Sequence, residues 1–104
     1  MDNHSVAICV DPEAGPLESF AASELQSCLA KLFGVTAHIT SESGQPADAR
    51  FIVGMKGRPH VERASGGLPS LSDQGHLLRR VSGDTMVLAG GSPAAVCWAV
   101  YELV

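Results

Sequence analysis

Residues 86–93, Met86-Val87-Leu88-Ala89-Gly90-Gly91-Ser92-Pro93, decide the fold, because strand chemistry changes to helix chemistry within this one stretch. It opens with an apolar run that is typical of a buried strand. Two glycines then allow a tight turn, after which Ser92 can cap a helix and Pro93 suits its first turn. We therefore predict a strand at residues 84–90 and a helix at residues 93–104.

The predicted last helix is apolar nearly all round, since Glu102 is its only charged side chain. A helix that lies on a sheet needs only an apolar stripe, so a helix of this kind should be covered on its far side as well. It is either tucked between the first helix and the sheet or packed on a following domain. We favour the second arrangement, with Trp98, Tyr101 and Val104 as interface residues. A fragment that lacks the neighbouring domain should then form a weak homodimer through the same residues.

The residues before this stretch predict a hairpin. Residues 75–81 and 84–90 are strand-like runs separated by Ser82-Gly83, a spacing that suggests a tight antiparallel turn. Glycines and prolines interrupt residues 55–73, so we expect an irregular connection there with a helical turn at residues 60–64.

The first half of the chain predicts a strand, a helix and two more strands. Residues 5–10 form the first strand, and apolar residues then recur at helical spacing from Gly15-Pro16 to a glycine cap at Gly34. Residues 35–40 alternate apolar and polar side chains as a strand does, residues 41–49 form a loop, and residues 50–54 form a short buried strand. The apolar positions of the helix are Leu17, Ala21, Leu25, Cys28, Leu29 and Leu32.

Together these elements predict an α+β fold: a mixed β-sheet of about five strands with two main helices packed on one face, in the order β-α-β-β-β-β-α. The first strand, helix and second strand fit a right-handed parallel unit, and the hairpin adds antiparallel strands. A chain of 104 residues has the size of one domain, so we expect residues 1–104 to form a single accessory domain, itself a piece of a longer protein.

Composition excludes several classes of protein. The net charge is −4 and the seven Lys and Arg are scattered, which argues against nucleic-acid binding. The absence of an apolar run long enough for a bilayer argues for a soluble domain. The first ten residues do not resemble a signal peptide. Signal peptides are removed from mature proteins, so this absence leaves an extracytoplasmic location open. Cys9, Cys28 and Cys97 lie in apolar segments and are expected to be core thiols, with one bridge between two of them left open.

The metal-binding and anion-binding motifs are incomplete. His60-x-Glu62 resembles the opening of a zinc-deaminase motif, but the Pro-Cys-x-x-Cys partner is absent. The four histidines, His4, His38, His60 and His76, are expected to be surface groups, so we predict no metal and no other cofactor. Gly90, Gly91 and Ser92 form a weak anion-site candidate at a helix N-terminus, although a serine-capped turn explains the same residues.

No catalytic residue is assigned. Ser92 lacks the Gly-x-Ser-x-Gly frame of an activated serine. Four acidic residues near the first helix could offer two carboxylates for glycoside hydrolysis, but a solvated helix face is the simpler explanation; they are Asp11, Glu13, Glu18 and Glu24. The five aromatic residues lie in apolar segments, so little exposed stacking surface is expected; they are Phe20, Phe33, Phe51, Trp98 and Tyr101.

Five segments resemble, in order, a known family. Residues 21–29 (AASELQSCL) resemble its A-x-E-L-x-x-Y-L helix, residues 51–54 (FIVG) its I-x-V-G strand, and residues 73–78 (DQGHLL) its D-E-G-F/Y-x-I strand. Residues 86–93 and 99–103 (AVYEL) resemble its L-x-I-x-G-G-S-P and Y-A-V-Y-x-F-L ending. The chain thus resembles the non-catalytic N-terminal domain of α-glucuronidases and β-N-acetylhexosaminidases. It departs from the pattern at Cys28, where the family has an aromatic residue, and at Ala94-Ala95, where the family has Arg-Gly.

The resemblance implies an accessory domain that is not an enzyme by itself. In the family, this domain precedes a (β/α)8 barrel that supplies the catalytic carboxylates, so the expected partner is a C-terminal barrel of the same chain. A free-standing glycan- or anion-binding module at the Gly90 turn is the alternative. A minimal hydrolase that uses Glu24 or Glu62 is a third hypothesis.

Overall fold

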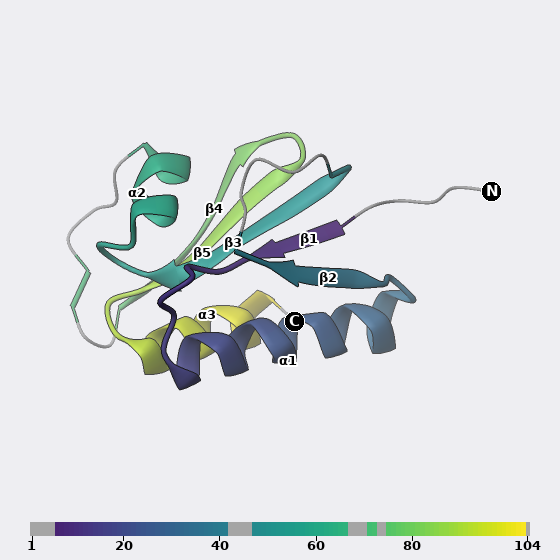
Figure 1. The fold of residues 1–104 in the computed structure, drawn as a ribbon, viewed down its shortest axis with the longest axis horizontal. Coiled ribbons are helices and arrows are strands. Elements are labelled where there is room, and N and C mark those ends of the chain that lie inside the picture. The colour runs from purple at the N-terminus through teal and green to yellow at the C-terminus, as the bar shows by residue number, and fades with distance from the viewer. Residues whose placement is uncertain (1–5, 42–46, 67–70, 73–74, 104) are drawn as a thin grey trace.

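The computed structural model describes residues 6–41, 47–66, 71–72 and 75–103. Within these residues the chain forms a five-stranded sheet with helices on both faces (Figure 1). The elements are β1 (Val6–Cys9), α1 (Pro16–Phe33), β2 (Ala37–Thr40), β3 (Ala49–Met55), α2 (Pro59–Ser65), β4 (His76–Ser82), β5 (Thr85–Gly90) and α3 (Pro93–Leu103). The predicted order of five strands and two main helices is confirmed, and α2 is added to it.

The strands lie in the order β2-β1-β3-β5-β4. β1 is parallel to both β2 and β3, β3 is parallel to β5, and β4 is antiparallel to β5. The mixed sheet with a parallel first unit and a C-terminal hairpin is therefore confirmed. The hairpin turn lies one residue later than predicted, because Ser82 pairs with Thr85 and leaves Gly83 and Asp84 between the strands. The Asp84 carboxylate accepts hydrogen bonds from Ser82 Oγ at 2.8 Å and Thr85 Oγ1 at 3.0 Å, which hold this turn.

Two helices cover one face of the sheet and the third covers the other. α1 and α3 lie side by side below the sheet in Figure 1, and α2 lies above it. The helical turn predicted at residues 60–64, within an irregular connection, is part of a longer helix, α2, which begins at Pro59 and ends at Ser65. Gly66 caps it with a left-handed φ of 71°. α2 packs closely on β3 at Gly54, where a Cβ would come within 2.9 Å of Val61 Cγ2.

Alternation along the strands divides the core into two layers. In β1, Val6 and Ile8 face α1 and α3, whereas Ala7 and Cys9 face α2. The α1/α3 layer is the larger of the two; its buried residues are Val6, Ile8, Ala21, Ala22, Leu25, Leu29, Ala37, Val53, Leu88, Val96, Cys97, Ala99 and Val100. The α2 layer contains Ala7, Cys9, Ile52, Val61, Val87 and Ala89. The central strands β1, β3 and β5 supply both layers.

The three cysteines are thiols that take part in no disulfide bond within the described residues. Cys9 and Cys97 are buried, and Cys28 is half-buried. Burial raises the pKa of the Cys9 thiol, against the opposing charge of Arg50, and burial also raises the pKa of Cys97. A thiol with a raised pKa is a poor nucleophile at neutral pH. Cys9 and Cys97 therefore act as packing residues, as predicted.

Candidate functional site

The two long helices meet along a seam that leads to an exposed surface. The Cys97 thiol lies 3.5 Å from the Leu17 carbonyl oxygen, and the Tyr101 hydroxyl donates a hydrogen bond to Glu24 Oε1 at 3.3 Å. Residues 17–24 of α1 therefore run beside residues 97–101 of α3.

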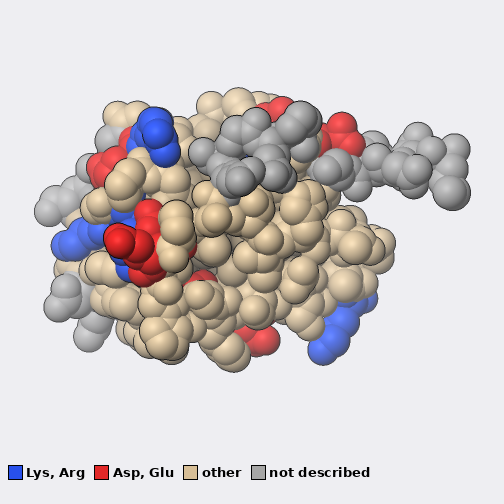
Figure 2. Space-filling model, in the orientation of Figure 1, with Lys and Arg blue, Asp and Glu red and all other residues tan. Residues whose placement is uncertain are grey.

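Large apolar side chains stand outward on both sides of this seam. Leu17, Phe20, Trp98 and Tyr101, here called the α1/α3 outer face, are each 44–48% exposed. Leu17 and Tyr101 border the seam, and Phe20 and Trp98 follow at a three-residue spacing on each helix. In Figure 2 the front of α1 is mostly uncharged, and most charged side chains gather near the loops at the left of the view. Apolar side chains exposed together in this way are typical of an interaction surface.

The last helix was expected either to be tucked between the first helix and the sheet or to pack on a following domain, and the structure has a feature of each arrangement. The sheet side of α3 is buried against the α1/α3 layer through Ala95, Val96, Ala99 and Val100. Its outer side is not covered by the described residues. Of the three predicted interface residues, Trp98 and Tyr101 lie on the exposed side, and Val104 lies outside the described residues. Leu17 and Phe20 were missed as surface residues, because Leu17 was assigned to the apolar repeat of the helix and Phe20 was expected to be covered within an apolar segment.

The first helix does not carry a solvated acidic face, because Glu18 is only 1% exposed. Its carboxylate accepts hydrogen bonds from Arg58 Nη2 at 2.7 Å, Arg58 Nε at 3.2 Å, the Met55 amide at 3.1 Å and the Gly15 amide at 3.4 Å. Burial opposes the charged form, but these hydrogen bonds outweigh it, so the pKa of Glu18 lies below its ordinary value. The same contact raises the pKa of Arg58. Sequence reasoning missed Arg58, since it is 40 residues from Glu18 along the chain.

This ion pair fills the position at which open α/β sheets often bind ligands. β1 and β3 are parallel neighbours whose following helices, α1 and α2, lie on opposite faces of the sheet (Figure 1). Such a change of side opens a crevice at the carboxyl ends of the two strands. Here Glu18, from the start of α1, and Arg58, from the turn before α2, meet across that place. The crevice is thus occupied by protein side chains.

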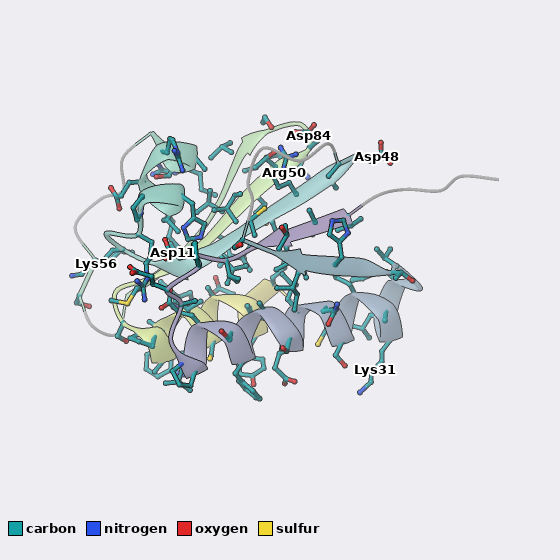
Figure 3. All side chains as sticks on the ribbon, viewed as in Figure 1. Asp11, Lys31, Asp48, Arg50, Lys56 and Asp84 are labelled. Carbon is teal, nitrogen blue, oxygen red and sulfur yellow. The ribbon has the colours of Figure 1, made fainter. Side chains whose placement is uncertain are left out.

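His60 is buried rather than on the surface, which corrects the prediction for this histidine. Its Nε2 lies 3.0 Å from the Val53 carbonyl oxygen, and its Nδ1 lies 3.7 Å from Asp11 Oδ2. The contacts anchor α2 to β3 and to the loop after β1, whose Asp11 is labelled in Figure 3. Within the described residues, no group of three or more His, Cys, Asp or Glu side chains converges to hold a metal ion.

The Gly90 turn is organised by protein contacts. The Gly91 amide donates to the Gly75 carbonyl oxygen at 2.8 Å, and the Ala95 amide donates to Ser92 Oγ at 3.3 Å. Ser92 is therefore the helix cap that the sequence indicated. A Cβ at Gly90 would lie 2.4 Å from the Val96 amide nitrogen, so close packing of α3 requires this glycine. Anion binding by Gly90, Gly91 and Ser92 stays a prediction, and two amides of the turn already have protein acceptors.

Comparison with known proteins assigns the family. The family model described as the glycosyl hydrolase family 67 N-terminus matches residues 3–103. The chain therefore belongs to the family of glycosyl hydrolase family 67 N-terminal domains. No curated protein sequence matches it significantly. None of the helices in the described ranges combines the length and apolar character that a bilayer span requires.

Solved structures share the fold. A family GH115 4-O-methyl-α-glucuronidase with specificity for decorated arabinogalactans matches 95% of this chain at 22% identity, with a TM-score of 0.79. A GH138 enzyme that targets pectin rhamnogalacturonan II matches 95% of this chain at 11% identity, with a TM-score of 0.64. This chain spans only 13% and 12% of the length of those two proteins.

Proposed function

We propose that this chain is a non-catalytic N-terminal domain of a carbohydrate-active enzyme and that it braces a following catalytic domain. The α1/α3 outer face is the observation that carries the proposal. Leu17, Phe20, Trp98 and Tyr101 form an apolar surface on one side of the molecule, and family membership supports a neighbour from the same chain.

The energetics favour an intramolecular partner. Covering a few hundred Å² of apolar surface at about 25 cal/mol per Å² provides several kcal/mol. Association of separate molecules consumes much of this in lost translational and rotational entropy, whereas a domain on the same chain has a high effective concentration. A modest apolar face is therefore enough to hold a tethered catalytic domain.

The chemistry of the described residues supports a non-catalytic role. Of the two carboxylates considered for a minimal hydrolase, Glu24 accepts a hydrogen bond from Tyr101, and Glu62 Oε2 accepts one from the Gly57 amide at 3.2 Å. The buried Glu18 is engaged by Arg58. These carboxylates hold elements of the fold in place, so we assign catalysis to the following domain and the bracing role to this one.

Hydrogen exchange can test the proposal by comparing the 104-residue chain with a longer protein that also contains the proposed catalytic domain. We expect amides of α1 and α3 to exchange more slowly there than in the 104-residue chain, and the difference to vanish in the double variant Phe20→Asp, Trp98→Asp. Phe33→Asp is the matched control, since Phe33 is 66% exposed but lies about 20 Å along α1 from Phe20. Equal exchange in the long and short proteins, or a gene that ends without a catalytic domain, would contradict the proposal.

The exposed aromatic residues also favour a second candidate function, a glycan-binding module. The prediction of little exposed aromatic surface was wrong, because Phe20, Trp98 and Tyr101 are each about half exposed and Phe33 more so. Aromatic rings of this kind stack on sugars in many binding modules. Titration of the 104-residue chain with neutral oligosaccharides, followed by Trp98 fluorescence, separates the two: saturable quenching supports the module, and its absence supports the bracing role alone.

A further inference from the structure

Acidic side chains border the α1/α3 outer face at one end. Glu24 follows Phe20 by one turn of α1, so the two side chains are neighbours on the same side of the helix. Glu24 Oε1 accepts the hydrogen bond from the Tyr101 hydroxyl at 3.3 Å, which holds the carboxylate beside the seam. The exposed Glu102 follows Trp98 by one turn of α3 in the same way. One end of the apolar surface therefore carries two carboxylates.

These carboxylates have no basic counterpart on the two helices beside the seam. Residues 16–30 of α1 and 93–103 of α3 contain no Lys or Arg. The next basic residue of α1, Lys31, lies about 10 Å further along the helix axis than Glu24 (Figure 3). Among the described residues, Glu24 forms no salt bridge. The outer face is thus apolar over most of its area and negative at one end.

A second copy of the chain does not supply the missing positive charge. Pairing through Trp98 and Tyr101 would bring the carboxylates of Glu24 and Glu102 from both copies to one interface. Neither copy contributes a Lys or Arg from the adjoining parts of α1 and α3. Like charges that face each other in an interface oppose association. A partner that binds this face tightly therefore has to bring its own cation.

Arginine is the cation best suited to this position. Its planar guanidinium can make a two-point contact with a carboxylate and can also stack on an aromatic ring, whereas the ammonium group of lysine is a compact point charge. The Tyr101 ring is 48% exposed and lies beside the Glu24 carboxylate. A guanidinium placed there contacts the carboxylate and the face of the ring together.

We propose that the partner of the α1/α3 outer face is an apolar surface of the following catalytic domain that carries one arginine. Its apolar side chains cover Leu17, Phe20 and Trp98. Its arginine binds Glu24 and stacks on Tyr101. This inference rests on the proposed bracing function and adds the chemistry of the partner to it. A docked position that buried the Glu24 carboxylate without a cation would be unfavourable, so the arginine also selects one orientation of the two domains.

Hydrogen exchange in the longer protein tests the partner through the variant Glu24→Gln. Glutamine keeps an oxygen for the Tyr101 hydroxyl but carries no charge. We expect the slowing of exchange that docking gives to α1 and α3 to fall about ten-fold, as for the loss of one charge-assisted contact. Glu62→Gln is the matched control, since Glu62 lies on α2, on the opposite face of the sheet, and as glutamine also keeps an oxygen for its amide donor.

Salt gives a second measurement on the same proteins. Raising the NaCl concentration from about 0.05 M to about 0.5 M screens charges at a partly exposed interface. Exchange from α1 and α3 should therefore become faster in the natural long protein, whereas Glu24→Gln should respond little, because the charge that salt screens is already absent.

Self-association of the 104-residue chain should respond to Glu24→Gln in the opposite direction. Removal of like charges from a face-to-face pair should strengthen association about two- to five-fold in small-angle scattering, as expected for partly exposed charges. A variant that only disturbed the packing of α1 on α3 would instead weaken docking and self-association together. The sign of the change therefore separates a charge effect from a loss of structure.

The results distinguish this inference from the bracing function. Slow exchange from α1 and α3 in the long protein that is unchanged by Glu24→Gln and by salt would overturn the arginine contact and leave the bracing function supported. Equal exchange in the long and short proteins would overturn both. Equal losses in Glu24→Gln and Glu62→Gln, or a parallel loss of docking and self-association in Glu24→Gln, would overturn the arginine contact alone.

Discussion

Glu18 and Arg58 form an ion pair with Oε1 and Nη2 2.7 Å apart, and it joins the start of α1 to the turn before α2. Glu18 is 1% exposed and Arg58 is 24% exposed, so water reaches only one partner. Two backbone amides complete the shell of the carboxylate. Helices on opposite faces of the sheet are thus linked through one side-chain contact at the carboxyl edge of the strands.

Removal of the arginine should be costly. In Arg58→Met the Glu18 carboxylate stays buried without its cation, and we expect the free energy of unfolding to fall by about 2–3 kcal/mol, near the lower limit for buried pairs because Arg58 is partly exposed. Arg80→Met removes an exposed arginine and should change stability by less than about 0.5 kcal/mol. Urea denaturation at neutral pH measures both. A loss no greater in Arg58→Met than in Arg80→Met would show that the pair adds nothing to stability.

The same pair should make stability depend on pH in the acid range. Because the folded pKa of Glu18 lies below its ordinary value of 4.5, its stabilising contribution is complete above about that pH and is lost as the pH falls through the folded pKa. Urea midpoints measured from about pH 6 down to about pH 3 should therefore fall more steeply for the natural chain than for Glu18→Gln. The exposed Asp84 also has a lowered pKa, so Asp84→Asn serves as the comparison and should flatten the profile less. Identical profiles for the natural chain and Glu18→Gln would assign the acid response to other groups.

Close packing at Gly90 gives a prediction about the turn before α3. An added Cβ would lie 2.4 Å from the Val96 amide nitrogen and 2.6 Å from the Ala95 carbonyl carbon, both backbone atoms that cannot move alone. Gly90→Ala should therefore destabilise the fold by about 1–3 kcal/mol or more. Gly83→Ala is the control, since nothing lies within 4 Å of the corresponding Cβ in the hairpin turn. If thermal unfolding midpoints of the two variants are the same, α3 does not require the glycine.

Local sequence patterns predicted most of the fold, because most of its elements depend on residues that are close together in the chain. The hairpin and the Ser92-capped helix depend on neighbouring residues, and both were found within one residue of their predicted positions. α2 was missed as a full helix because it has only seven residues, too few for an apolar repeat. Its position depends on the space left by Gly54, which belongs to a different element.

Part of the exposure along α1 depends on the length of the helix relative to the strands, which the spacing of apolar residues does not reveal. An 18-residue helix is about 27 Å long, whereas the four-residue strands β1 and β2 span only about 13 Å. The helix is therefore longer than these two strands, and Leu32 near its last turn is exposed although it fits the apolar repeat, whereas Leu17 is exposed because it lies on the α1/α3 outer face. The carboxylate beside the seam could not be predicted either, since Glu24 and Tyr101 come from two elements that only the fold brings together.

The last prediction concerns the 104-residue chain on its own, without the proposed catalytic domain on the α1/α3 outer face. We expect weak self-association through Trp98 and Tyr101, because burial of a few hundred Å² of apolar surface only partly exceeds the entropy cost of pairing. Trp98 is the only tryptophan and is 44% exposed, so its fluorescence should shift to the blue as concentration rises.

Variants and solution scattering complete this test. Trp98→Lys cannot be followed by tryptophan emission, so small-angle scattering against concentration is the common measurement. Trp98→Lys should remain monomeric, and Phe33→Lys should associate like the natural chain, because Phe33 is exposed at the far end of α1 from the seam. A natural chain that stays monomeric at about millimolar concentration, where weak interfaces are populated, would show that this face is stable in water and would leave the bracing role supported by family membership alone.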